Sequence, residues 1–332
     1  MQHGMQLYLA NAIPKTDTDD SIQEVYPCYY PSFACVGGTC RHNCCIGWEI
    51  DIDNEALRRY QQAEGDFADR LRQGISMEET PHFRLDGCQR CVFLNQHNLC
   101  SIILNMGEDA LCEICAEHPR FRNHLPGRVE IGLGLCCEEA GRLILGRPEP
   151  MRLLTQGTPE TDDEVIALRD EVILLLQDRS RSIRERLARM KQLMGCPQAA
   201  PPLSSLVELL LSLERLDEQW THLLNRVLQP LHEESLAAFD AHMEHRMTEY
   251  EQLAVYLVYR HMANACSEQE LAACAAFVAW GTELLYRMGA AQFAHTGSFT
   301  PDDQVELARL FSSELEYSEE NMAILLNPDG QL

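Results

Sequence analysis

Residues 33–48 read FACVGGTCRHNCCIGW, with four cysteines and two adjacent glycines. Three more cysteine groups follow, in 87–102 (GCQRCVFLNQHNLCSI), 111–120 (LCEICAEHPR) and 134–142 (GLCCEEAGR). Thiolates are soft anionic ligands, and four of them suit Zn²⁺ or an iron–sulfur cluster. Glycines allow the positive φ that a loop wrapping a metal often needs. These groups therefore predict a thiolate metal site in the first part of the chain.

The chain has 15 cysteines, and 12 of them lie between Cys28 and Cys137. Its first residues, MQHGMQLYLANAIPKTDTDD, have no basic residue before the short apolar stretch, so we expect no secretory signal and a cytoplasmic protein. Disulfides are rare in that reducing compartment, and an odd number cannot pair completely. Burial as small hydrophobic residues is the other interpretation, and it suits three isolated cysteines: Cys196, Cys266 and Cys274. Spacing does not decide between zinc and iron–sulfur.

The overall composition excludes several classes of protein. The 332 residues are 45% hydrophobic and 23% charged, which is ordinary for a globular protein with a buried core. A formal charge of −24 would repel a phosphate backbone, so nucleic acid is excluded as a partner, while a basic protein partner is compatible. No apolar run approaches the roughly 20 residues of a membrane helix, so we expect no membrane association. The oligomeric state is not fixed by the sequence.

Three regions are expected along the chain: a weakly ordered tail at 1–25, a cysteine-rich metal-binding domain at 26–150 and a helical domain at 151–332. The boundary falls in 146–150, GRPEP, because proline disfavours helix at the residue before it. The predicted fold class is mainly α, with a cysteine-rich N-terminal region containing short strands that packs on a C-terminal helical bundle.

Apolar periodicity predicts the helices of the second half. Apolar residues at three- and four-residue steps predict one helix over 165–194, ended by Gly195 and Pro197, and another over 206–227. Ser267 with Glu270 predicts a capping box at the start of a later helix. Thr300 followed by Pro301 predicts a further helix start, with an N-cap and a proline at its first position.

One half-buried strand is predicted in the cysteine-rich region. Residues 48–53, WEIDID, alternate apolar and acidic residues, so Trp48, Ile50 and Ile52 should face the core. Asp53 should cap a helix over 54–62.

Several of these stretches resemble the flagellin lysine-N-methylase family. The likeness begins at 29–53, YYPSFACVGGTCRHNCCIGWEIDID, and continues through the later cysteine groups to CEEAGRLIL at 137–145. Weaker similarity follows at 169–187, RDEVILLLQDRSRSIRERL, and at 256–261, YLVYRH. The resemblance implies eight recurrent cysteines as metal ligands: Cys35, Cys40, Cys44, Cys45, Cys91, Cys100, Cys115 and Cys137.

The resemblance also implies an activity, namely methyl transfer from S-adenosylmethionine to lysine side chains of flagellin. It favours an iron–sulfur cluster over zinc. The sequence has neither a glycine-rich dinucleotide loop nor the CxxxCxxC spacing of radical S-adenosylmethionine enzymes, so it assigns no S-adenosylmethionine site and no catalytic residue. A non-enzymatic iron–sulfur or zinc protein, acting as a redox module or an adaptor, is the alternative.

Overall fold

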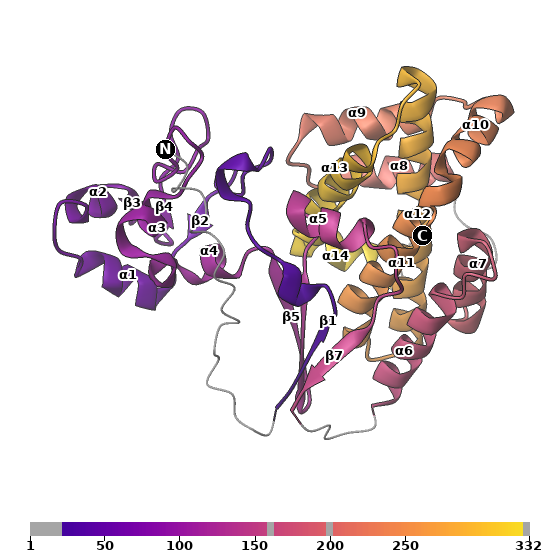
Figure 1. The fold of residues 1–332 in the computed structure, drawn as a ribbon, viewed down its shortest axis with the longest axis horizontal. Coiled ribbons are helices and arrows are strands. Elements are labelled where there is room, and N and C mark those ends of the chain that lie inside the picture. The colour runs from indigo at the N-terminus through magenta and orange to yellow at the C-terminus, as the bar shows by residue number, and fades with distance from the viewer. Residues whose placement is uncertain (1–21, 158–162, 197–201, 328–332) are drawn as a thin grey trace. The chain divides into compact units, whose positions relative to one another are not determined.

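The computed structural model describes residues 22–157, 163–196 and 202–327, which are mainly helical, as predicted (Figure 1). The described residues form two compact units: unit 1 is Ala34–Phe121, and unit 2 combines 22–33 with 122–327. Of the predicted tail, 1–21 lie outside the described residues, whereas 23–25 belong to a strand. The units divide after residue 121, so the domain boundary predicted near 150 falls within unit 2.

Unit 1 is a small unit of short elements around an aromatic core. Its helices are α1 (Asn54–Gln61), α2 (Ala68–Gln73), α3 (Ser101–Met106) and α4 (Glu113–Glu117), and its strands are β2 (Ile50–Asp51), β3 (Ile75–Ser76) and β4 (His82–Phe83). The strands pair antiparallel in the order β2-β4-β3. Phe83 packs edge-to-face on Phe93 and lies against Tyr60, and all three side chains are buried.

The strand predicted at 48–53 is shorter than expected and differs at its first residue. Ile50 and Ile52 are buried as predicted, but the expectation for Trp48 was wrong because its side chain is 39% exposed. Its indole N–H donates to the Cys44 carbonyl at 2.8 Å, a bond that holds the ring over the cysteine loop instead of in the core. The predicted cap is confirmed, since Asp53 accepts two backbone N–H groups at the start of α1.

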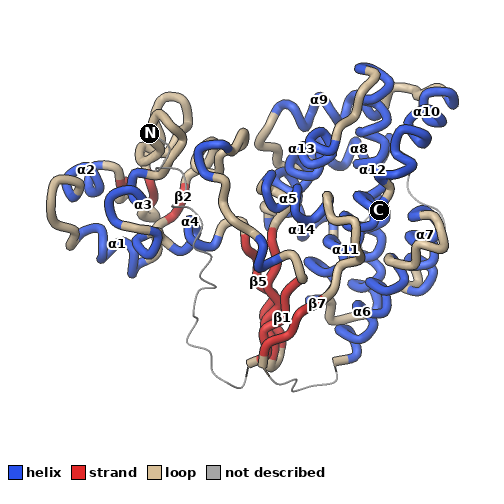
Figure 2. The backbone as a smooth tube through the Cα atoms, in the orientation of Figure 1, coloured by secondary structure: helices blue, strands red, loops and turns tan. Residues whose placement is uncertain are grey.

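Unit 2 contains a four-stranded mixed sheet, in which the strand order is β5-β6-β1-β7 (Figure 2). The strands are β1 (Gln23–Pro27), β5 (Arg120–Leu125, whose first two residues belong to unit 1), β6 (Arg128–Leu133) and β7 (Leu153–Gln156). β1 pairs parallel with β6 and antiparallel with β7. The Tyr259 hydroxyl lies 3.0 Å from the Val25 carbonyl and 3.1 Å from the Ile131 carbonyl, and so connects β1 and β6 to the helices.

The helices of unit 2 are α5 (Glu138–Leu145), α6 (Glu164–Leu176), α7 (Ile183–Leu193), α8 (Leu203–Ser212), α9 (Glu218–Val227), α10 (Glu233–Met243), α11 (Thr248–His261), α12 (Glu268–Thr296), α13 (Pro301–Phe311) and α14 (Glu319–Leu325). A π-helical turn, Ser312–Glu316, follows α13. α11 is buried along nearly its whole length and contacts α5, α6 and α12 (Figure 1). This explains why its sequence has no clear polar face.

Periodicity predicted two long continuous helices, and both predictions were wrong because each stretch forms two separate helices. The 165–194 stretch breaks into α6 and α7, because Ser182 forms a capping box with Glu185 and starts a new helix. The 206–227 stretch breaks into α8 and α9, where Asp217 accepts the Gln219 N–H. Apolar spacing continues across both breaks, so periodicity alone does not reveal them.

The predicted helix ends agree better with the structure than the predicted helix lengths do. Gly195 has a φ of +67° after α7, as a helix terminator requires, while Pro197 lies outside the described residues. Thr300 forms a capping box with Asp303, with Pro301 at the first position. Ser267 caps α12, but Glu270 bonds the Cys266 N–H instead of closing a capping box.

Among the described residues, no helix combines the length and the apolar character needed to cross a membrane.

Candidate functional site

Backbone pairing in unit 1 brings separate cysteine groups together. The Cys91 N–H donates to the Cys45 carbonyl at 2.8 Å. Antiparallel bridges join Leu85 to Cys91 and Leu94 to Cys100. The first and second cysteine groups, which lie more than 40 residues apart in sequence, are thereby fixed side by side.

The two glycines of the first group serve different purposes. Gly37 has a φ of +54°, the left-handed conformation expected from the sequence. Gly38 is required for close approach, because a Cβ built there would lie 2.5 Å from the His97 carbonyl oxygen. The first cysteine loop therefore packs directly on the loop that precedes Cys100.

Two thiol–thiol pairs lie within this group of loops. The Cys44 and Cys45 side chains are hydrogen-bonded, which raises the pKa of Cys45 and lowers that of Cys44. Cys112 and Cys115 form the same kind of pair, with the pKa of Cys115 raised and that of Cys112 lowered. Each pair thus holds one thiol that ionises more readily than its neighbour.

The remaining thiols of unit 1 surround these pairs. Burial raises the pKa of Cys91 to about 11, and the charges of Cys100 and Cys112 add to the shift. Cys100 in turn interacts electrostatically with Cys44 and Cys112. Cys35 is exposed and interacts electrostatically with Cys44. The thiols of unit 1 that influence one another in this way are Cys35, Cys44, Cys45, Cys91, Cys100, Cys112 and Cys115, which we call the thiol cluster.

Six of the eight predicted ligands lie in the thiol cluster. Cys112, which the resemblance left out, joins them, and its CxxC spacing with Cys115 was the signal that could have included it. The Cys40 thiol lies 3.2 Å from the His42 carbonyl in the first loop. Cys137 belongs to unit 2, where it is the N-cap residue of α5.

The donors suit a metal in kind, because soft sulfur ligands from three chain segments pack against an apolar core. Within 22–157, 163–196 and 202–327, however, no three Cys, His, Asp or Glu side chains stand in an arrangement that could hold a metal ion. The eight-cysteine centre and the choice between iron–sulfur and zinc stay predictions.

Unit 2 contains a buried polar network centred on Glu316, at the end of the π-helical turn. One carboxylate oxygen lies 2.6 Å from His261 Nε2 and 3.5 Å from Arg260 Nε. The other accepts the Tyr256 hydroxyl at 2.9 Å. The Tyr256 oxygen itself accepts from Arg260 at 2.7 Å and from the Leu135 N–H at 3.2 Å.

Two opposing effects set the charges in this network: burial disfavours the charged form of each group, and interactions with neighbouring groups can favour it. Burial opposes ionisation of Glu316, but Arg260 and the His261 hydrogen bond outweigh it and lower the pKa to about 2. Burial lowers the pKa of His261, and Glu316 only partly offsets this. At neutral pH the network therefore holds a carboxylate, a guanidinium and a neutral imidazole.

The fourth cysteine group lies beside this network. Burial raises the pKa of Cys136 to about 12, opposed by a hydrogen bond with Tyr317 and the charge of Arg260. The Arg260 guanidinium also lies 5.0 Å from the centre of the Tyr317 ring. The π-helical turn places Glu316 and Tyr317 side by side here, and such turns are frequent at functional sites.

Two further buried carboxylates are matched by arginines. Glu130 accepts two hydrogen bonds from Arg169, at 2.7 and 2.8 Å, and both side chains are fully buried. Glu251 pairs with Arg179 at 2.8 Å and with Arg186 at 2.7 Å. Fork-shaped guanidinium groups satisfy such buried carboxylates bidentately.

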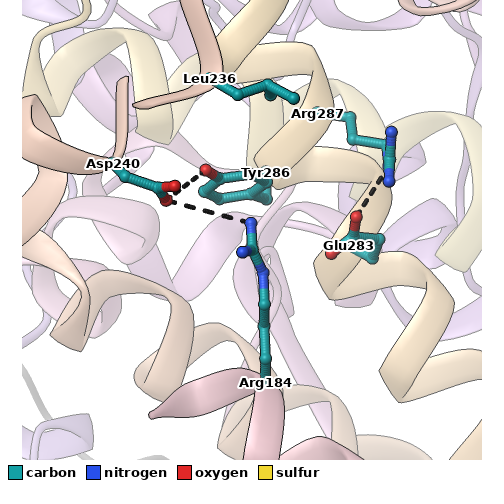
Figure 3. A pocket seen from close by; sticks show the side chains of 6 residues that line it. All are labelled: Arg184, Leu236, Asp240, Glu283, Tyr286 and Arg287. Atoms are coloured by element: carbon teal, nitrogen blue, oxygen red, sulfur yellow. Dashed lines mark hydrogen bonds and ion pairs between the residues drawn. The ribbon is translucent and has the colours of Figure 1, made fainter. Parts of the chain in front are cut away.

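A pocket of about 420 Å³ lies among α7, α10 and α12. Its lining comprises Arg184, Leu236, Asp240, Glu283, Tyr286 and Arg287 (Figure 3). Tyr286 lies between Asp240 on one side and the Glu283–Arg287 pair on the other (Figure 3). The pocket thus combines carboxylates, guanidinium groups, a phenol and an aliphatic side chain.

Sequence reasoning missed the charged groups of unit 2. Arg260 and His261 end the YLVYRH stretch, and Arg169 and Arg184 lie in the 169–187 stretch, so both weak similarities coincide with buried networks or the pocket. Charged side chains within apolar helical sequence were the available signal, because buried charges need partners. The partner Glu316 comes from a distant segment and had no signal of its own.

Comparison with known proteins gives matches in the C-terminal part. Residues 197–328 match the family model described as the FliB lysine N-methylase C-terminal domain. This range includes the Glu316 network, apart from Leu135, and every pocket residue except Arg184. No solved structure matches the chain.

Curated relatives carry the same name. Lysine-N-methylases of Salmonella typhimurium and Salmonella choleraesuis are each 27% identical over 134 residues, 38% of this chain and 33% of theirs. The flagellar biosynthetic protein FliU of Salmonella muenchen is 26% identical over 134 residues, 38% of this chain and 79% of its own. The match spans about a third of the length of the two lysine-N-methylases. These matches confirm the resemblance to the lysine-N-methylase family.

Proposed function

We propose that the chain is an S-adenosylmethionine-dependent protein-lysine N-methyltransferase that acts on flagellin. The observation that carries this proposal is the match of 197–328 to the lysine N-methylase C-terminal domain. The names of the curated relatives, one of them flagellar, support flagellin as the substrate. The chain's strongly acidic character is compatible with a basic segment approaching it.

The proposed reaction is an in-line displacement. The neutral lysine nitrogen forms a bond to the methyl carbon as the bond from that carbon to the sulfonium sulfur breaks, and the ammonium proton is lost to solvent or a base. Free lysine has a pKa of about 10.4, so the protein must favour the neutral amine and align it with the methyl group. Desolvation of the amine lowers its pKa and serves the first requirement.

The second part of the proposal is a cysteine-ligated metal centre in unit 1, iron–sulfur in preference to zinc. The thiol cluster would supply the ligands. Six of its cysteines also belong to the predicted set: Cys35, Cys44, Cys45, Cys91, Cys100 and Cys115. When bound, such a centre would supply either redox chemistry or rigidity to a unit whose helices and strands are short. Metal binding would require the thiols to release their protons and to adjust their positions.

The test is methylation of purified flagellin by the full chain, isolated without oxygen and supplied with S-adenosylmethionine. We expect the intact mass of flagellin to rise in steps of one methyl group. No gain with metal-replete protein and the matching flagellin would contradict the enzyme assignment.

Elemental analysis and a visible spectrum of the same preparation test the metal. We expect iron with matching inorganic sulfide, and we expect Cys45→Ser to lose it while Cys266→Ser, at an exposed cysteine outside the cluster, keeps it. A coloured protein that bleaches reversibly on reduction but does not methylate would favour the redox module. A colourless protein holding zinc, again without methylation, would favour the adaptor.

A further inference from the structure

The pocket among α7, α10 and α12 has a balanced set of charges in an otherwise acidic molecule. Its lining has two carboxylates, Asp240 and Glu283, and two guanidinium groups, Arg184 and Arg287. In a chain with 51 acidic and 27 basic residues, acidic side chains would be expected to outnumber basic ones around a surface pocket. The balance therefore limits the chemistry of a ligand.

On one side of the pocket lies the carboxylate of Asp240, which interacts with two neighbouring side chains. Asp240 Oδ1 accepts the buried Tyr286 hydroxyl at 2.6 Å and lies 4.0 Å from Arg184 Nη2 (Figure 3). The Arg184 guanidinium lies 4.6 Å from the centre of the Tyr286 ring. Burial and Asp240 raise the pKa of Tyr286 to about 12, so its hydroxyl stays a donor. The other Asp240 oxygen makes no hydrogen bond to a described residue and is available to a cationic group.

The opposite side presents a guanidinium. Arg287 Nε donates to Glu283 Oε1 at 2.7 Å, one turn earlier on α12 (Figure 3). The terminal nitrogens of Arg287 make no hydrogen bond within the part of the chain that the structure describes. A guanidinium held through Nε keeps two parallel N–H groups for a carboxylate.

These two sides together fit an α-amino acid group better than a simple ion. A lysine ammonium would meet two guanidinium groups, and a phosphate would meet two carboxylates. An ammonium and a carboxylate on one carbon would satisfy both sides without leaving net charge. Tyr286 and Leu236 provide apolar surface for the carbon chain that leaves this α-carbon.

We propose that this pocket binds the amino-acid end of S-adenosylmethionine, with Asp240 binding the ammonium and Arg287 the carboxylate. The choice of this zwitterion rests on the proposed function, whereas the preference for an α-amino acid group rests on the pocket. The nucleoside part would extend from the amino-acid end.

The test is calorimetric titration of the full chain, isolated without oxygen, with two probes. S-Adenosylhomocysteine has the amino-acid end, and 5′-methylthioadenosine keeps the nucleoside and thioether without it. Asp240→Asn keeps an oxygen that accepts the Tyr286 hydroxyl, and Arg287→Gln keeps a hydrogen-bond donor. The matched control is Arg181→Gln, which removes a guanidinium paired with Asp178 near α7 but outside the pocket lining.

We expect both pocket variants to bind S-adenosylhomocysteine about ten- to a hundredfold more weakly, as for loss of a charged hydrogen bond. Their affinity for 5′-methylthioadenosine should be unchanged, a selectivity that general damage to the fold would not produce. The control should bind both probes as the wild type does.

The inference is overturned if the wild type binds no S-adenosylhomocysteine, if either variant binds it as tightly as the wild type, or if both probes weaken equally. The flagellin assay separates this from the proposed function. Methylation by the wild type with unchanged binding in the variants refutes the pocket alone. The expected binding pattern without methylation supports the pocket and refutes the enzyme assignment.

Discussion

The two units differ in which polar side chains lie in or near their cores and in how those side chains are satisfied. In unit 1 thiols from loops joined by a backbone hydrogen bond pack against the small apolar cluster around Phe83 and Phe93. In unit 2 the buried polar groups include carboxylates, and each of Glu130, Glu251 and Glu316 meets an arginine. The helical core is large enough to enclose complete ion pairs, whereas the small unit uses sulfur, which costs less to bury.

This difference also gives a physical context for the scarcity of lysine, which is present only at Lys15 and Lys191. The basic partners of Glu130, Glu251 and Glu316 are arginines and one histidine. An ammonium group cannot reproduce the bidentate bonds that Arg169 makes with Glu130. Arginine abundance is thus partly structural in unit 2.

The largest expected effect comes from breaking a buried pair in unit 2. Glu130→Gln removes the buried charge that pairs with Arg169 and Arg128 and leaves the Arg169 guanidinium with only the partly exposed Asp170, so the free energy of unfolding should fall by about 3–5 kcal/mol. Chemical denaturation monitored by circular dichroism measures this. The control is Asp178→Asn in a surface pair, which should leave the free energy of unfolding nearly unchanged. Equal effects would show that unit 2 does not depend on its buried pairs.

A smaller effect is expected in unit 1 from Tyr60→Phe. The buried Tyr60 hydroxyl donates to the Ala110 carbonyl at 2.7 Å, and its removal leaves that carbonyl unsatisfied at a cost of about 1–3 kcal/mol. Hydrogen exchange should show the loss in amides of unit 1 and leave those of α11 and α12 unchanged. Equal loosening of both units would contradict their description as separate compact units.

Acidification should act on unit 2 through His261. Its pKa in the folded chain lies below the ordinary value, so the unfolded chain binds the proton more readily and stability falls as the pH drops below about 6.5. Between pH 7.5 and 5.5 this group contributes at most about 1.4 kcal/mol, since its unfolded pKa lies one unit above the lower pH. Denaturation at both pH values measures the loss.

His261→Gln is the matched variant, because glutamine can donate to Glu316 without titrating. We expect it to show a smaller difference between pH 7.5 and 5.5 than the wild type. The same difference in both proteins would assign the acid sensitivity to other groups.

The smallest effect should follow Trp48→Phe in unit 1. The indole is partly exposed and contributes one hydrogen bond to the Cys44 carbonyl, so the free energy of unfolding should change by about 0.5–1 kcal/mol. A larger loss in a thermal melt would show that Trp48 is a core residue, as its place in the alternating sequence suggested.

Local signals in the sequence located several features correctly. The caps at Asp53 and Thr300 depend on a side chain and the next few backbone N–H groups, so they can be read directly. Six of the eight predicted ligand cysteines lie in the thiol cluster, but backbone pairing between distant loops brings their groups together, and the metal centre itself stays a prediction. Cys112 could have been added on its CxxC spacing alone.

The sequence by itself determined the mainly helical fold class and several helix ends, because these depend on residues close together along the chain. Only the tertiary structure decided which cysteine groups lie together, the partner of Arg260 and His261, and the pocket among α7, α10 and α12. Each of these depends on which distant segment supplies the opposing charge or packing surface. Periodicity and spacing do not encode that choice, because a buried charge specifies that it needs a partner but not where in the chain the partner lies.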